Sequence, residues 1–203
     1  MADWSTDSFE DLYASVGGDL DRVPWARLGP NPLLVAWLDR RVITPGSRAL
    51  VIACGLGDDA EELAGRGCAV TAFDLSETAI SWCRRRFPTS SVHYQVADLL
   101  ALPGDWARRY DIVVEVNTIQ SISPALRDRT VRAIADTVAP GGALFVRCAG
   151  RADDEPVDAR PWPVSRKDLA AFERAGLREV EFAEDDPEPG RHRWFRAAYE
   201  RIF

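Results

Sequence analysis

The sequence predicts an α/β fold with a mostly parallel sheet, and its 203 residues suffice for one such domain with a large buried core. Three observations support this prediction. Ala49–Asp74 follows the pattern of a strand, a glycine turn, a helix and a second strand. Further short apolar segments alternate with helical patterns along the chain, as in folds with parallel strands. Near the C-terminus, Leu177–Phe182 and Arg193–Ile202 predict two strands joined by a short connection without a helix, so they should pair antiparallel.

The segment Ala49–Asp74 also predicts a ligand. A buried strand over Ala49–Ala53 leads into the glycine turn Cys54–Gly57, and a helix over Asp58–Arg66 returns to a strand that ends at Asp74. Glycines let a ligand approach the backbone closely, and an acid at the end of the second strand accepts hydrogen bonds from ribose hydroxyls. We therefore expect a cofactor that contains a nucleoside.

The remaining elements follow from periodicity and from turn residues. Further helices are expected over Ser8–Val16, Pro30–Val42, Glu77–Arg86, Pro124–Val138 and Ser165–Ala175. Further strands are expected over Val92–Val96, Tyr110–Val116 and Ala143–Val146, with a tight turn at Ala139–Gly142 and a loop or short helix over Leu100–Arg109.

The composition excludes several classes of function. A net charge of −7 argues against a general nucleic-acid or anionic-membrane surface, which would need a basic face. The four cysteines show no CxxC spacing and there are two histidines, so no metal site is expected. The acidic N-terminus does not resemble a signal peptide, and no apolar run approaches the ~18 residues of a membrane span. We expect a cytoplasmic protein with a small-molecule partner, as a monomer or homodimer.

Two types of cofactor compete for the glycine turn. Gly55–Ala60 satisfies GxGxx(G/A), and Asp74 lies 19 residues after Gly55, so a nicotinamide dinucleotide is formally allowed. Against it, the following helix opens with Asp58-Asp59 and Glu61-Glu62, and a pyrophosphate at its N-terminus would meet four carboxylates. In addition, Asp98 at the end of the third strand suits an exocyclic amine such as that of adenine.

Five segments, in order along the chain, resemble the motifs of class I S-adenosylmethionine-dependent methyltransferases. They are Ala53–Gly57, Asp74–Ser76, Ala97–Leu99, Tyr110–Glu115 and Ala139–Gly142. The resemblance covers about residues 25 to 203. It implies a Rossmann-like seven-stranded sheet in the order 3-2-1-4-5-7-6, with strand seven antiparallel and helices on both faces. It also implies S-adenosylmethionine as the cofactor and S-adenosylhomocysteine as the product.

The same resemblance implies the cofactor site. Asp74 would anchor the ribose, and Asp98 would hold the adenine between Leu75 and Leu99. The implied cofactor-binding residues are Ala53, Cys54, Gly55, Gly57, Asp74, Leu75, Ala97, Asp98, Leu99, Glu115 and Val116.

A narrower resemblance concerns the N-terminus. Phe9–Tyr13, Pro24-Trp25 and Pro32–Leu34 are similar to the N-terminal part of thiopurine and small-thiol methyltransferases. It implies that Tyr13 and Trp25 cover the cofactor and that residues 1–30 form a flap or lid on a single domain spanning 1–203. On residue pattern alone, the first helix could equally pack on the domain as a plain flap, and Trp25 could belong to the core.

Few catalytic side chains are expected, because a sulfonium is an activated methyl donor and the protein mainly aligns the acceptor and excludes water. A hydroxyl acceptor would need a general base, for which Glu115 is best placed, with Asn117 beside it; a cofactor contact is the alternative role of Glu115. A thiol would need no dedicated base. Arg147, Arg160 and Trp162 are candidate substrate residues, although surface ion pairing or packing would also explain them.

The sequence therefore predicts a methyltransferase that acts on a thiol, hydroxyl or similar nucleophile of a small molecule by in-line displacement. Two alternatives remain open: a non-catalytic S-adenosylmethionine-binding protein and an NAD(P)-dependent oxidoreductase. The sequence does not identify the methyl acceptor.

Overall fold

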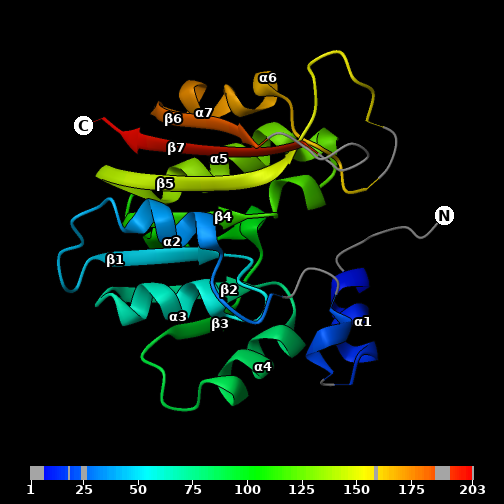
Figure 1. Cartoon of the computed structure of the whole chain (residues 1–203), viewed down its shortest axis with the longest axis vertical. Coiled ribbons are helices and arrows are strands. Elements are labelled where there is room, and N and C mark those ends of the chain that lie inside the picture. The colour runs from blue at the N-terminus through cyan, green and yellow to red at the C-terminus, as the bar shows by residue number, and fades with distance from the viewer. Residues whose placement is uncertain (1–6, 18, 24–26, 158–159, 186–192, 203) are drawn as a thin grey trace. The chain divides into compact units, whose positions relative to one another are not determined.

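A computed structural model describes residues 7–17, 19–23, 27–157, 160–185 and 193–202. Its seven strands are ordered β3-β2-β1-β4-β5-β7-β6 (Figure 1). Strand β7 pairs antiparallel with both β5 and β6, whereas β1 with β2, β2 with β3 and β4 with β5 pair in parallel. This order confirms the predicted fold. The chain divides into two compact units, residues 1–98 and 99–203, which are described in turn.

In its described residues, the first unit holds three strands and four α-helices. The strands are β1 (Arg48–Ile52), β2 (Ala69–Asp74) and β3 (His93–Val96). The helices are α1 (Asp7–Ser15), α2 (Pro32–Leu38), α3 (Asp58–Gly65) and α4 (Glu77–Arg86), with a short 3-10 turn at Leu20–Arg22. Side-chain caps fix two helix starts: Asn31 Oδ1 accepts the Leu33 N–H at 3.0 Å, and Ser76 Oγ accepts the Ala79 N–H at 3.0 Å.

The part of the second unit that the structure describes holds four strands, three α-helices and short 3-10 turns. The strands are β4 (Tyr110–Val116), β5 (Val138–Gly150), β6 (Leu177–Asp185) and β7 (Arg193–Arg201). The helices are α5 (Arg127–Thr137), α6 (Arg166–Leu169) and α7 (Ala171–Arg174). The 3-10 turns are Leu99–Ala101, Gly104–Trp106, Ile119–Ser121 and Pro124–Leu126. Ser165 and Asp168 form the capping box of α6.

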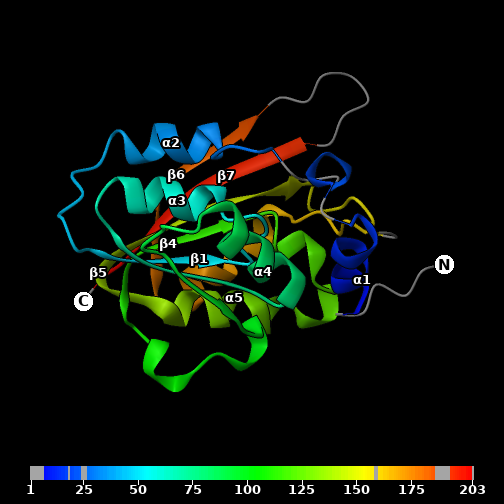
Figure 2. The same ribbon diagram turned by 90° about the horizontal axis from the view of Figure 1, so that it is seen from below.

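The predicted turn at Ala139–Gly142 lies inside β5, which runs unbroken from the end of α5 (Figure 2). Tyr110 pairs with Val138 and Ile112 with Ala143, so β5 has extra residues between these two pairs and the register shifts there. A Cβ on Gly142 would lie 2.8 Å from the carbonyl oxygen of Tyr110. The predicted turn is therefore wrong: Ala139–Gly142 is part of the strand, with Gly141 at a φ of +74° where the register of the ladder shifts.

Two predicted helices are shorter than expected. The Asn31 cap starts α2 at Pro32, and the helix ends at Leu38. The helix predicted to follow Ser165 is divided into α6 and α7 at Ala170. Among the described residues, no helix is long and apolar enough to cross a membrane.

Candidate cofactor and acceptor sites

The glycine turn after β1 has a backbone conformation that favours glycine. Ala53, Gly55 and Gly57 have φ angles of +46°, +54° and +88°. A Cβ on Gly57 would lie 2.6 Å from Tyr94 Oη and 3.1 Å from Cys83 Sγ, so no larger residue fits there without displacing buried neighbours. The turn is thus packed tightly against β3 and α4.

Asp74, at the end of β2, is joined directly to this turn. Its Oδ2 accepts the Gly55 N–H at 2.9 Å, and its Oδ1 accepts the Ser76 N–H at 3.0 Å. Burial raises the pKa of Asp74, and the backbone N–H groups of Ser76, Gly55 and Leu75 oppose that rise. Since a carboxylate has about four acceptor sites, Asp74 can also accept a hydrogen bond from a hydroxyl. The glycine turn and Asp74, which the sequence predicts to bind a nucleoside, are therefore joined by a hydrogen bond.

Asp58, at the start of α3, forms an ion pair rather than presenting its charge to a ligand. Arg86 donates to both carboxylate oxygens, at 2.9 and 2.8 Å, and also donates to the carbonyl oxygen of Leu56 within the glycine turn. Arg86 thus offsets the charge of Asp58 and braces the turn at the same time.

The other three acids of α3 are also engaged within the protein. Asp59 Oδ1 accepts the Asn31 N–H at 2.7 Å, and Arg66 Nε donates to Glu62 at 2.7 Å. Glu61 accepts the hydroxyls of Tyr94 and Ser90, each at 2.6 Å. Asp58 and Glu62 thus pair with arginines, whereas Asp59 and Glu61 accept hydrogen bonds from uncharged donors. That a pyrophosphate at the start of α3 would meet these acids stays a prediction.

Tyr13 of α1 reaches the same turn. Its side chain is 2% exposed and packs edge-on against Trp82 of α4, with the ring centroids 5.7 Å apart. A Cβ placed on Gly55 would lie 3.2 Å from Tyr13 Oη, so this hydroxyl oxygen lies directly over the turn. That Tyr13 covers a cofactor stays a prediction, and Trp25 lies outside the described residues.

Glu10, also on α1, is a site residue that the sequence did not reveal. Its Oε2 accepts the Ser76 hydroxyl at 2.5 Å and the Thr78 N–H at 3.2 Å, and its Oε1 accepts the Thr78 hydroxyl. Burial by itself would raise the pKa of Glu10, but these hydrogen bonds outweigh it and the pKa is lowered. No local sequence signal could have linked Glu10 to residues 66 and 68 positions away.

Apolar side chains lie exposed at the ends of β2 and β3. Leu75 is 38% and Val96 45% exposed, and the Ala97 N–H donates to the carbonyl oxygen of Asp74 at 3.1 Å. Asp98 is exposed and ends the first unit, whereas Leu99 begins the second and is buried. The predicted adenine sandwich between Leu75 and Leu99 stays a prediction.

In the second unit, Glu115 lies near the end of β4 and is completely buried. Its Oε1 accepts the N–H groups of Thr118 at 2.6 Å and Ile119 at 3.0 Å, while its Oε2 has no hydrogen-bond partner among the described residues. Burial raises the pKa of Glu115 to about 7, against the opposing effect of those two N–H groups. This acid therefore changes its charge near neutral pH.

Asn117 connects the ends of β4 and β5. Its N–H donates to the carbonyl oxygen of Arg147 at 2.8 Å, and its Oδ1 accepts from Arg147 Nη1 at 3.2 Å. The guanidinium of Arg147 lies 4.0 Å from the ring centroid of Trp194, a stacked cation–π arrangement. The structure thus brings together Asn117 and Arg147, which the sequence assigned separately to catalysis and to substrate binding.

Arg160 and Trp162 both donate hydrogen bonds to the 3-10 turn Ile119–Ser121, which follows β4. Arg160 donates through Nε and Nη2 to the carbonyl oxygen of Ser121, and its guanidinium lies 5.2 Å from the Trp162 ring centroid. The Trp162 N–H donates to the carbonyl oxygen of Gln120 at 2.7 Å. Arg151, in contrast, pairs with Asp168 at 3.3 Å.

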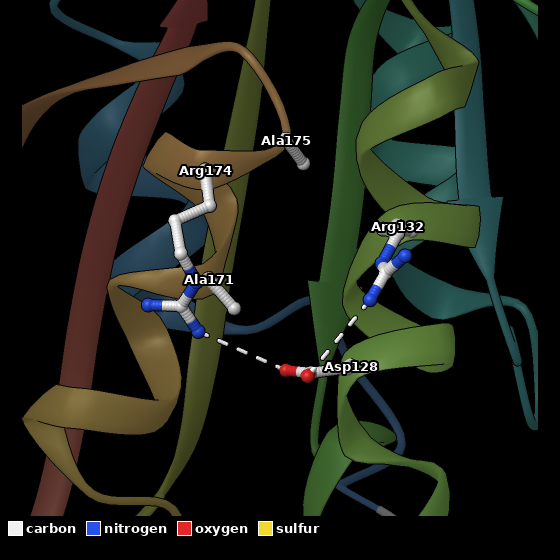
Figure 3. A pocket seen from close by; sticks show the side chains of 5 residues that line it. All are labelled: Asp128, Arg132, Ala171, Arg174 and Ala175. Atoms are coloured by element: carbon white, nitrogen blue, oxygen red, sulfur yellow. Dashed lines mark ion pairs between the residues drawn. The ribbon is translucent and has the colours of Figure 1, made fainter.

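One hollow of the second unit lies apart from all these residues. It has a volume of about 200 Å³ and is lined by Asp128, Arg132, Ala171, Arg174 and Ala175 (Figure 3). The Asp128 carboxylate lies 3.9 Å from Arg132 and 3.7 Å from Arg174, and all three side chains are more than 60% exposed. Long, solvated ion pairs of this kind contribute little, so this hollow gives no functional site.

The central part of the chain is similar in sequence to known methyltransferases. Residues 49–142, which include the glycine turn, Asp74 and β4, match the family described as "Methyltransferase domain". The curated relatives include a ubiquinone biosynthesis O-methyltransferase of Aromatoleum aromaticum, 36% identical over 124 residues, and one of Azotobacter vinelandii, 32% identical over 124 residues. Each match covers 60% of this chain and 52% of the relative, so the chain spans about half the length of the curated relatives it matches.

Solved structures resemble the chain over nearly its full length. One, described as "Conversion of a Disulfide Bond into a Thioacetal Group during Echinomycin Biosynthesis", has a TM-score of 0.79 and 22% identity and covers 97% of this chain and 91% of the other. The magnesium protoporphyrin IX methyltransferase of Synechocystis PCC 6803 has a TM-score of 0.77 and 16% identity, with 97% and 100% covered. The fold is therefore that of the class I S-adenosylmethionine-dependent methyltransferases. Within it, residues 49–142 are the part of the chain that matches the methyltransferase-domain family.

Proposed function

We propose that this protein is an S-adenosylmethionine-dependent methyltransferase that acts on a small molecule. The observation that carries the proposal is the hydrogen bond from the Gly55 N–H to Asp74 Oδ2, within the segment that matches the methyltransferase domain. It supports a nucleoside site in which the turn approaches the cofactor and Asp74 accepts the ribose hydroxyls. The proposed cofactor-binding residues are Tyr13, Trp25, Ala53, Cys54, Gly55, Gly57, Asp74, Leu75, Ala97, Asp98, Leu99, Glu115 and Val116.

The residues present fit such a cofactor. Exposed Leu75 and Val96 offer apolar faces for a flat base close to Asp74. The hydroxyl oxygen of Tyr13 over Gly55 gives the turn a polar neighbour on the side of α1. When bound, the cofactor supplies an activated methyl group; the protein aligns the acceptor with the methyl–sulfur bond and keeps water out.

A hydroxyl is the proposed accepting group. The curated relatives are described as O-methyltransferases, and a phenolic hydroxyl, with a pKa of about 10, needs a base to react at neutral pH. Glu115, whose pKa burial raises to about 7, supports this role because a base near the working pH transfers protons efficiently. A thiol acceptor, which needs no dedicated base, is the alternative.

Arg147, Arg160 and Trp162 are the proposed acceptor-binding residues, with Asn117 as the link between β4 and β5. The guanidinium group of Arg147 lies over Trp194, and that of Arg160 lies over Trp162. Each pair gives a flat surface that is both cationic and aromatic. We therefore propose an acceptor that is an aromatic ring with an anionic substituent. Arg147→Met should raise the KM for a carboxylated phenol by about tenfold and leave that for its uncharged analogue within about twofold.

The remaining parts of the proposal concern the whole chain. We propose that residues 1–203 act as one methyltransferase domain, with 1–30 as a lid, in the cytoplasm, as a monomer or homodimer, and without a metal ion or nucleic-acid partner.

A direct test combines binding and turnover. Isothermal titration with S-adenosylhomocysteine and with NADH decides the type of cofactor, and binding of NADH alone would contradict the proposal. Release of S-adenosylhomocysteine is then measured with matched phenols, catechols and thiols, with and without a carboxylate. Turnover of phenols or catechols but not thiols is the expected result.

A second candidate is a protein that binds S-adenosylmethionine without transferring its methyl group. One solved structure similar to this chain is described as the [4+2]-cyclase SpnF, with a TM-score of 0.76 and 15% identity. That likeness concerns the fold alone, and the fold by itself does not determine the reaction. Tight binding of the cofactor without turnover of any acceptor in the panel would favour this candidate.

A further inference from the structure

The N-terminal helix α1 is attached to α4 by one carboxylate. Glu10 accepts the Ser76 hydroxyl at 2.5 Å, the Thr78 N–H at 3.2 Å and the Thr78 hydroxyl. Ser76 is the N-cap of α4 and Thr78 lies in its first turn. A carboxylate placed there also interacts favourably with the positive end of the helix dipole. We call the contact of Glu10 with Ser76 and Thr78 the Glu10 clasp.

The clasp shares Ser76 with the proposed ribose anchor. The Ser76 N–H donates to Asp74 Oδ1 at 3.0 Å, while the Ser76 hydroxyl donates to Glu10 Oε2. One residue therefore orients both carboxylates, and the negative charge of Glu10 acts on Asp74 as well, since it contributes to raising the pKa of that acid. The position of α1 and the geometry of Asp74 depend on the same main-chain segment.

The clasp also positions Tyr13. Glu10 and Tyr13 are three residues apart on α1 and so lie on the same face of the helix. While Glu10 holds the start of α4, the Tyr13 ring packs against Trp82 and its hydroxyl oxygen lies over Gly55. Val16, Val23, Leu56 and Ala79 complete this buried apolar cluster. The clasp thus adds charged hydrogen bonds to the apolar packing of α1.

We propose that Glu10 is a positioning residue of the cofactor site, which fastens α1 to the start of α4 so that Tyr13 closes over the glycine turn and slows the release of the cofactor. This inference rests on the proposed function, because it assigns a cofactor to that turn. Glu10 acts through Tyr13 and Ser76 and has no contact with the reacting atoms.

The test compares two isosteric variants that break the clasp from opposite sides. Glu10→Gln removes the negative charge from α1, and Thr78→Val removes a hydroxyl donor from α4. Asp11→Asn is the matched control, because it removes the same charge from the neighbouring, exposed residue of α1. The dissociation rate constant of S-adenosylhomocysteine is measured by competition with excess S-adenosylmethionine, and backbone hydrogen exchange is followed over residues 7–16.

Each clasp variant should increase the dissociation rate constant about tenfold, equivalent to about 1.4 kcal/mol, and should speed exchange of residues 7–16. The double variant should release the ligand no faster than the more affected single variant, since both changes break the same contact. The Asp11→Asn control should match the wild type. A wild-type dissociation rate in Glu10→Gln, or fully additive effects in the double variant, would overturn the inference. Failure of the wild-type protein to bind S-adenosylhomocysteine would instead overturn the proposed function.

Discussion

Asp74 and Glu115 hold equivalent positions in the two units, yet their side chains are used differently. Asp74 ends β2, and Glu115 lies near the end of β4. Asp74 accepts the N–H groups of Gly55 and Ser76. Glu115 accepts those of Thr118 and Ile119. In Asp74 the two N–H groups are divided between the two oxygens. In Glu115 both bind Oε1, and Oε2 has no hydrogen-bond partner among the described residues.

This difference shows that the role of an acid at a strand end depends on how the next turn presents its N–H groups. The oxygens of Asp74 are both oriented by the main chain, which suits an anchor that holds a ligand in one geometry. Glu115 has one oriented oxygen and one buried oxygen, and its pKa is raised to about 7, which suits a group that exchanges a proton. The two acids can be tested by the same isosteric change from carboxylate to amide.

Asp74→Asn should produce the largest effect. The variant loses a charged acceptor for the ribose hydroxyls, and its amide nitrogen would oppose either the Gly55 or the Ser76 N–H. We expect the Kd for S-adenosylhomocysteine to rise by about 100-fold or more, since hydrogen bonds to charged groups contribute about 1.5–3 kcal/mol each. Isothermal titration measures it, with Asp105→Asn, an exposed acid paired with Arg109, as the control. An unchanged Kd would remove Asp74 from the site.

Glu115→Gln should affect turnover more strongly than cofactor affinity. The glutamine Oε1 can still accept the Thr118 and Ile119 N–H groups, so the turn keeps its geometry while the base is lost. We expect kcat for a phenolic acceptor at pH 8 to fall by about 10²–10⁴. The wild-type kcat should rise with pH through about 7, as the carboxylate forms, and the variant should lack this step. A variant that keeps both the wild-type kcat and the pH step would assign Glu115 a structural role.

Much of the first unit was predictable because its signals are local. The glycine turn, the strand that ends at Asp74 and the helix Glu77–Arg86 all lie within short stretches of sequence, and the structure contains each of them. The antiparallel pairing of β6 and β7 was likewise encoded by a connection too short for a crossover.

Contacts between distant segments were not predictable. The bonds of Glu10 to Thr78, of Arg86 to Asp58 and of Tyr94 to Glu61 join residues that are 28 to 68 positions apart. They depend on how helices and strands pack, which one sequence does not reveal. The acids of α3 illustrate this limit, since the sequence showed four charges but not their partners.

Asp59, a half-buried acid in the first turn of α3, is a third case. Its ionisation affects stability, and it has no proposed role in catalysis. Its pKa is raised to about 6, first by burial, although the Asn31 N–H opposes the rise. Because the folded-state pKa lies above the unfolded value of 3.8, the folded protein binds more protons between these values. Ionisation therefore lowers stability progressively as pH rises from about 4 to 6.

Asp59→Asn should abolish this dependence, because its Oδ1 can still accept the Asn31 N–H without a buried charge. We expect the variant to exceed the wild type in free energy of unfolding by about 2–3 kcal/mol at pH 8 and to match it near pH 4. Urea unfolding at both pH values measures the difference, with Asp105→Asn as the exposed control. A loss of stability at pH 8 would show instead that Asp59 is held as a favourable anion, and the effect of burial on Glu115 would then need the same revision.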